Sequence, residues 1–134
     1  MLKGGCIHPH LLRALALCGH GDKVLIADGN YPLASLSGQA EKIYLGVLPD
    51  LPRVTDVLAA VLSVCQFEGM ELMRPEEGEP EIYREFGEML SSVPAQKLGR
   101  SEFYAQCGAP QVRVAVSTGE SRTFANILLT VGVV

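Results

Sequence analysis

The run Val24-Leu25-Ile26-Ala27 is the feature that most restricts how this chain can fold. Four apolar residues in succession predict a strand that is buried on both faces, as the inner strands of parallel sheets are. The strand is expected to end at the turn formers Asp28-Gly29-Asn30 and at Pro32. A strand of this kind needs a layer of structure on each side, so it favours an α/β fold.

Helical and strand-like segments alternate along the rest of the chain. Apolar residues at helical spacing, two of the runs opened by a proline, predict helices over 9–18, 53–65 and 80–90, with a shorter one over 101–107. Short apolar runs predict further strands at 42–46, 70–73, 95–98, 112–116 and 126–130. This order predicts one domain over 1–134, a three-layer α/β/α sandwich around a mixed, mostly parallel sheet.

Four local expectations concern the ends and connections of these elements. Gly19 is expected to cap the first helix in the left-handed conformation, and Ser101 to cap the last one at its N-terminus. The small, polar segment 33–39 is expected to be a loop. Thr118-Gly119-Glu120-Ser121 precedes a strand rather than a helix and lacks the lysine of a phosphate loop, so it predicts a hairpin turn.

The amino-acid composition restricts the kinds of partner and the cellular setting that we expect for this protein. Hydrophobic residues make up 48% of the chain and charged ones only 19%, which predicts that neighbouring subunits cover some apolar surface. The net charge of −4 and the scattered basic residues argue against a nucleic-acid partner. Four widely spaced cysteines predict a reducing, cytoplasmic setting. We expect no signal peptide and no membrane span, since the longest apolar run, 57–65, is far below the ~18 residues that a span needs.

His20 is the histidine with a plausible chemical task. It lies between Gly19 and Gly21, which leave its ring unshielded, and either Asp22 or Asp28 could orient one ring nitrogen. A histidine presented in this way suits general acid and base catalysis near neutral pH. The alternative is a surface histidine in a glycine-rich turn, and spacing alone does not choose between the two.

Other polar residues have ordinary interpretations beside the functional ones. Asp28 could accept a hydrogen bond from a substrate hydroxyl, or it could cap a turn with Gly29 and Asn30. The motif His8-Pro9-His10 could form a metal site together with His20. We favour the interpretation that Pro9 simply begins a helix, because no carboxylate lies at a spacing suitable for a metal ligand. Cys18 as a nucleophile beside His20 is less favoured than Cys18 as a core residue. Glu76-Glu77 lies in a solvated turn, which gives little support to a glycosidase.

Taken together, the motifs resemble the RbsD/FucU family of sugar mutarotases and pyranases, and within it the L-fucose mutarotase branch. The resemblance covers nearly the whole chain and is weakest over 39–95. It rests on Leu11-Leu12, Gly19-His20-Gly21-Asp22, Asp28-x-Asn30-Tyr31-Pro32, Arg100-Ser101-Glu102-Phe103-Tyr104, Thr118-Gly119-Glu120, Phe124-Ala125-Asn126-Ile127-Leu128-Leu129 and Gly132-Val133.

The resemblance implies a role for each matching residue. The family's proton donor falls on His20 and its sugar-binding aspartate on Asp28. The binding arginine of the fucose branch falls on Arg100, where ribose-type pyranases have histidine, and the C-terminal sugar-binding triplet falls on Phe124, Ala125 and Asn126. The family commonly has tyrosine where this chain has Phe124, so one polar contact or proton relay is missing.

The family further implies an isomerase that works without metal or cofactor, in homo-oligomers that in several members are ring-shaped decamers with sites at subunit borders. The first hypothesis is therefore a cytoplasmic mutarotase for L-fucose or a related monosaccharide, with ribose-type pyranase activity as a variant. The second is a sugar-binding or sensing protein that has kept the pocket and lost turnover, and it is motivated by Phe124.

Overall fold

A mixed sheet of six strands runs through the centre of the molecule, which a computed structural model describes over residues 1–134. The strands are β1 (Lys23–Ala27), β2 (Glu41–Tyr44), β3 (Phe67–Met73), β4 (Ala95–Leu98), β5 (Val112–Ser117) and β6 (Ile127–Val131). Their order across the sheet is β2-β5-β1-β6-β3-β4. Only β6 pairs antiparallel with its neighbours, so the sheet is mostly parallel, as predicted.

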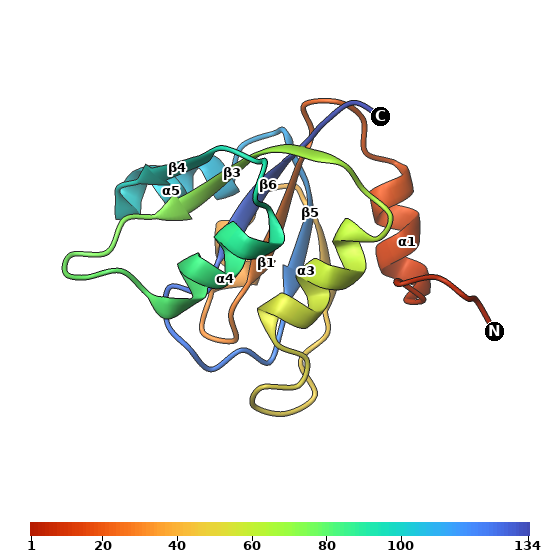
Figure 1. The fold of residues 1–134 in the computed structure, drawn as a ribbon, viewed down its shortest axis with the longest axis horizontal. Helices are drawn as coiled ribbons and strands as arrows, with labels where there is room; N and C mark the ends of the chain where they lie inside the picture. The colour runs from red at the N-terminus through yellow and green to blue at the C-terminus, as the bar shows by residue number, and fades with distance from the viewer.

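Helices cover both faces of this sheet (Figure 1). They are α1 (Pro9–Ala16), α2 (Leu33–Leu36), α3 (Val54–Leu62), α4 (Glu81–Met89) and α5 (Arg100–Cys107). The larger hydrophobic core lies under α1, α3 and α4, and a smaller one lies under α2 and α5. The three-layer prediction is therefore confirmed.

Strand β1 shows why the central run had to be wholly apolar. Val24 and Ile26 point into the larger core, whereas Leu25 and Ala27 point into the smaller one. All four are fully buried. Because side chains alternate along a strand, a polar residue at any of these positions would be placed inside one of the two cores.

The connection between β5 and β6 differs from the predicted hairpin. Strand β1 lies between them, parallel to β5 and antiparallel to β6, so residues 118–126 must pass over the end of β1. Along the way the Thr118 hydroxyl donates to the Ala27 carbonyl at 2.9 Å, and the Gly29 N–H donates to the Glu120 carbonyl at 2.9 Å. We call residues 118–126 the crossing loop.

Three other local expectations were wrong. Gly19 is not left-handed; Gly21 is, with φ of 88°. Residues 33–36 form the short helix α2, and the N-cap of α5 is Gly99 rather than Ser101. None of the helices combines the length and the apolar composition that a membrane-spanning helix requires.

Candidate functional site

A cavity of about 220 Å³ lies where β1, β3 and β4 end and the crossing loop meets the start of α5. Its lining includes four residues that the sequence resemblance singles out, Asp28, Arg100, Phe124 and Asn126. The other lining residues are Asn30, Tyr31, Met73, Tyr104 and Thr123. The carboxyl ends of strands are where α/β folds place ligands, and this volume lies below the roughly 300 Å³ at which pockets for drug-sized molecules begin. The cavity thus suits a small polar ligand.

Asp28 follows β1 directly and is 3% exposed. Burial raises the pKa of its carboxyl above the usual value, while hydrogen bonds from the backbone N–H groups of Asn30 and Ala125 and from the side chain of Asn126 oppose that rise. The Asp28 carboxylate is therefore a desolvated acceptor held in one orientation. Such a group is suited to bind a ligand hydroxyl.

Asn126 fixes the crossing loop to Asp28. Its side-chain oxygen accepts the backbone N–H of Asp28 at 2.7 Å, and both residues are buried. Within the crossing loop, directly before Asn126, Ala125 is fully buried and Phe124 adopts the left-handed conformation with φ of 59°. A positive φ is rare for a large side chain, so the surrounding contacts must hold Phe124 in this conformation. Phe124 packs against the edges of both cores.

Arg100 is the cation at this cavity. It is the exposed first residue of α5, directly after β4 and Gly99. The nearby Arg122 is already engaged: its side chain donates to Glu120 at 2.8 Å and to Glu85 of α4 at 2.5 Å. Arg100 is therefore the guanidinium positioned to reach a ligand here.

The ion-pair network around Arg122 holds the crossing loop from its other side. Glu120 is 1% exposed and also accepts the backbone N–H of Val54, at the start of α3. Burial alone would raise the pKa of Glu120, but hydrogen bonds and charge from Arg122 outweigh it and lower that pKa below its usual value. The network thus connects the crossing loop to α3 and α4.

Two tyrosines in the cavity lining were not identified as site residues from the sequence. The rings of Tyr31 and Tyr104 are 5.6 Å apart, and the Tyr31 hydroxyl donates to the Leu36 carbonyl at 2.8 Å. Both tyrosines belong to motifs on which the family resemblance rests, and this was the sequence signal from which they could have been identified as site residues.

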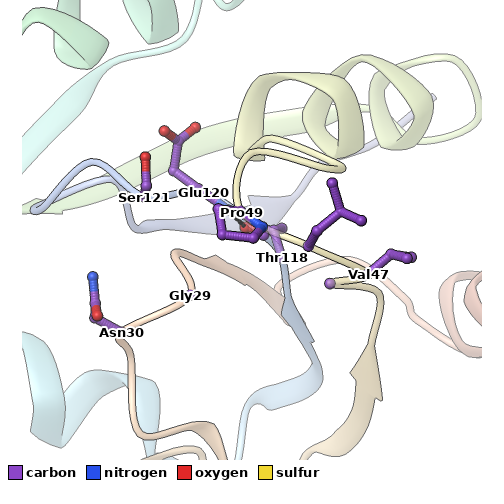
Figure 2. A pocket seen from close by; sticks show the side chains of 10 residues that line it. Gly29, Asn30, Val47, Pro49, Thr118, Glu120 and Ser121 are labelled. Carbon is purple, nitrogen blue, oxygen red and sulfur yellow. Dashed lines mark hydrogen bonds between the residues drawn. The ribbon is translucent and has the colours of Figure 1, made fainter.

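Figure 2 shows the residues that line a wider hollow of about 450 Å³. This hollow has Asn30 in common with the cavity. Its polar side chains are mostly engaged elsewhere: Thr118 binds the Ala27 carbonyl, Ser121 binds Asp50, and Glu120 binds Arg122. Because it has few free hydrogen-bonding side chains, we assign the candidate site to the smaller cavity.

His20 lies at the other end of β1. It precedes the strand, whereas Asp28 follows it, and the five residues of β1 span about 17 Å at roughly 3.3 Å per residue. His20 does not line the cavity. The expectation that Asp22 or Asp28 orients its ring was wrong: Asp22 accepts the Gly19 N–H at 2.8 Å, and the ring Nε2 lies 2.9 Å from Oε1 of Glu68. His8 instead caps α1, where its Nδ1 accepts the Leu11 N–H at 3.2 Å.

Comparison with known proteins gives consistent results. The model of the RbsD / FucU transport protein family matches residues 1–134. A D-ribose pyranase of Coprothermobacter proteolyticus is 31% identical over 135 residues, which cover 100% of this chain and 99% of that protein. A D-ribose pyranase of Paracidovorax citrulli is 35% identical over 139 residues, covering 99% and 98%.

Solved structures extend the similarity to the fold. RbsD of Bacillus subtilis, complexed with D-ribose, superposes with a TM-score of 0.87 at 27% identity and covers 100% of this chain and 99% of its own. The fucose mutarotase of Streptococcus pneumoniae, in complex with L-fucose, gives a TM-score of 0.77 at 27% identity, covering 96% and 94%.

Proposed function

Because the chain belongs to the RbsD/FucU family, we propose that it is an isomerase that interconverts the anomers of a monosaccharide by opening and closing the sugar ring. The observation that carries the proposal is the cavity in which a buried carboxylate, an amide and a free guanidinium converge: Asp28, Asn126 and Arg100. These groups can bind the hydroxyls of one small sugar, with Phe124 in the wall of the cavity and the buried Ala125 holding Asp28 through its backbone N–H.

The main chemical task of the protein in this reaction is proton transfer. A proton leaves the anomeric hydroxyl and another is added to the ring oxygen as the bond between that oxygen and the anomeric carbon breaks. The open-chain aldehyde rotates, and the same steps in reverse close the ring on the other face. In our proposal His20 is the acid and base, and Asp28, Arg100 and Asn126 fix the remaining hydroxyls.

His20 and the cavity lie at opposite ends of strand β1, so we propose that each site takes its histidine from a second copy of the chain. The end of the sheet that carries the cavity in one copy would then contact the end that carries His20 in the next. Such head-to-tail contacts close into rings when the rotation permits. A site shared in this way supports a homo-oligomer, and we specifically expect a decamer. We expect the protein to act in the cytoplasm.

For the sugar, we propose L-fucose or a related monosaccharide. Arg100 supports this choice, because it occupies the position of the binding arginine in the fucose branch that the sequence resembles. D-ribose is the alternative, and the pyranases of 31% and 35% identity favour it.

Exchange NMR tests the proposal directly. Saturating one anomer of fucose, ribose, galactose or rhamnose should transfer magnetisation to the other faster with protein than without, for at least one sugar. The His20→Ala variant should abolish that gain and keep the thermal unfolding transition. If none of the four sugars exchanges faster, the enzyme proposal fails.

The second candidate is a sugar-binding or sensing protein with weakened turnover, and Phe124 is the observation that favours it. Tyr104 lines the cavity, but the hydroxyl that the family commonly has at position 124 is absent. Under this alternative, NMR titration would detect binding of a sugar whose anomer exchange is not accelerated.

A further inference from the structure

A recess of about 310 Å³ lies at the opposite end of the sheet from the cavity, where β3 and β4 begin and β6 ends. Its lining includes Gly69, Met70, Glu71, Gln96 and Thr130. None of these residues lines the cavity that we assign to the reaction. We call this separate hollow the Gly69 recess.

Gly69 leaves the recess open. It is the third residue of β3, and Thr130 of β6 lies directly opposite it in the sheet register. A Cβ at position 69 would lie 3.7 Å from both Cβ and Oγ1 of Thr130, which is an ordinary contact distance. A side chain would therefore fit here, and its absence leaves space beside the Thr130 hydroxyl. Glycine inside a strand weakens the strand and often marks a place where a ligand approaches the backbone.

Glu71 brings a buried carboxylate to the same recess. Its Oε1 accepts a hydrogen bond from Nζ of Lys23 at 2.5 Å, and the two side chains are only 15% and 13% exposed. Its Oε2 is buried and has no hydrogen-bond partner in the protein. An unpaired buried oxygen costs free energy, so a ligand hydroxyl that donates to Oε2 would gain by removing this cost.

The polar groups around the recess indicate the kind of ligand. Lys23 balances the charge of Glu71, so the pair does not call for a cation. Gln96 of β4 lies directly opposite Glu71 in the sheet register and adds an amide, while Thr130 adds a hydroxyl. Carboxylate, amide and hydroxyl groups together complement a ligand whose hydroxyls both donate and accept hydrogen bonds.

We propose that the Gly69 recess is a second binding site, for an uncharged molecule with several hydroxyls and the size of a monosaccharide. The volume of the recess exceeds the 220 Å³ of the cavity, so it has room for one such molecule. Binding here requires neither turnover in the cavity nor the Asp28 carboxylate.

Two methionines provide one reporter for each site. Met70 lines the Gly69 recess, Met73 lines the cavity, and the chain has only four methionines. With ¹³C-labelled methionine methyl groups, L-fucose or D-ribose added to the whole chain should shift both NMR signals, each with its own midpoint. Met70→Leu and Met73→Leu assign the two signals. A Met70 signal that neither sugar shifts would overturn the proposal, whereas a shift of Met70 alone would support the recess and count against the cavity.

Filling the recess tests whether the Met70 shift reports binding there. Gly69→Val places a side chain beside Thr130 and should abolish the Met70 shift, while the midpoint of the Met73 shift stays the same. Gly87→Ala is the matched control, because it adds a side chain to α4 where no atom lies within 4 Å, and it should leave both shifts unchanged. An unchanged Met70 shift in Gly69→Val would refute the site.

Two further variants keep the test independent of how Gly69→Val folds. Thr130→Val retains the shape of the side chain and removes only its hydroxyl, so it should weaken binding in the recess a few-fold, the loss of one uncharged hydrogen bond. Asp28→Asn should raise the midpoint of the Met73 shift alone. If Asp28→Asn raises both midpoints equally, or Thr130→Val leaves the Met70 midpoint unchanged, the Met70 shift is a relayed effect of the cavity and the proposal fails.

Discussion

Asp28 is a carboxylate that the fold buries and then surrounds with N–H donors. Burial raises its pKa, so folding favours the protonated form, and the ionised form reduces stability once the pH rises above the ordinary value of 3.8. This cost at neutral pH is understandable if Asp28 serves binding rather than stability.

The Asp28→Asn variant should separate these two properties. Loss of a charged acceptor should weaken sugar binding by roughly 10- to 100-fold, the equivalent of about 1.5–3 kcal/mol for a hydrogen bond to a charged group. The melting temperature at neutral pH should not fall, because the variant removes a buried charge. NMR titration and thermal melts measure the two effects, and unchanged affinity would contradict the assignment of Asp28.

Phe124→Tyr tests what the missing hydroxyl costs. The backbone of residue 124 is already held at φ of 59°, and the new hydroxyl extends from a side chain that lines the cavity, so stability should not change. We expect a higher kcat with the preferred sugar, measured by anomer exchange. A control, Phe103→Tyr, places the same hydroxyl in the fully buried core under α5 and should destabilise the fold instead.

Residue chemistry could be predicted from the sequence at some positions and not at others. Asp28 lies at the end of a buried strand in both the prediction and the structure, because an apolar run followed by Asp-Gly-Asn is a local signal. The partner of His20 was predicted wrongly, because Glu68 reaches it through the pairing of β3 with β6, which nothing near His20 in the sequence indicates.

At the scale of elements, the crossing loop depends on the network of Glu120, Arg122 and Glu85. The lowered pKa of Glu120 means that folding stabilises its ionised form. The ionised Glu120 carboxylate contributes fully to folding stability at pH values above its ordinary pKa of 4.5. This contribution is lost as the pH falls through the lower pKa that Glu120 has in the folded protein. Acid should therefore loosen the crossing loop.

The Glu120→Gln variant should lower stability at neutral pH by about 3 kcal/mol, the lower end for breaking a buried ion pair, because Arg122 retains Glu85. The deficit relative to wild type should shrink as the pH drops below 4.5. Denaturant unfolding at several pH values measures the loss of stability, with Glu88→Gln on the exposed face of α4 as control. A raised KM is also expected in anomer-exchange kinetics, since the loop carries Phe124 and Asn126.

The helices and strands were mostly predictable, since their apolar spacing is a local property. The helix over 33–36 was missed because four residues give too little periodicity. The hairpin over 118–121 was wrong for a different reason: the insertion of β1 between β5 and β6 is a long-range pairing that turn residues do not encode.

For the whole molecule, the separation of His20 from the cavity makes the proposed site dependent on assembly. Apolar side chains that remain exposed on one copy, among them Tyr44, Val47, Leu48 and Leu51 near the end of β2, are consistent with this. The composition had already indicated covered apolar surface.

Mixing two impaired variants tests the shared site. His20→Ala lacks the proposed acid and base, and Asp28→Asn binds sugar weakly, so at a sugar concentration well below the weakened Kd each should show little activity alone. Co-refolding them in equal amounts should restore about a quarter of the sites if contacts are head-to-tail and random. Anomer exchange measures the recovered activity. Co-refolded mixtures that stay inactive, while wild-type protein treated in the same way recovers, would indicate that each copy works alone.

The reversed direction of β6 has a practical consequence for handling the protein. Because β6 alone runs against its neighbours, the strand that begins at the cavity delivers the last residues to the turn of His20, where Val131 binds Gly21 and Gly132 lies against Glu68. An affinity tag fused after Val134 would emerge beside the proposed acid and base. A tag before Met1 would lie on the α1 side, near the contact of Gly5 with Ser63, and is the better choice for kinetic work.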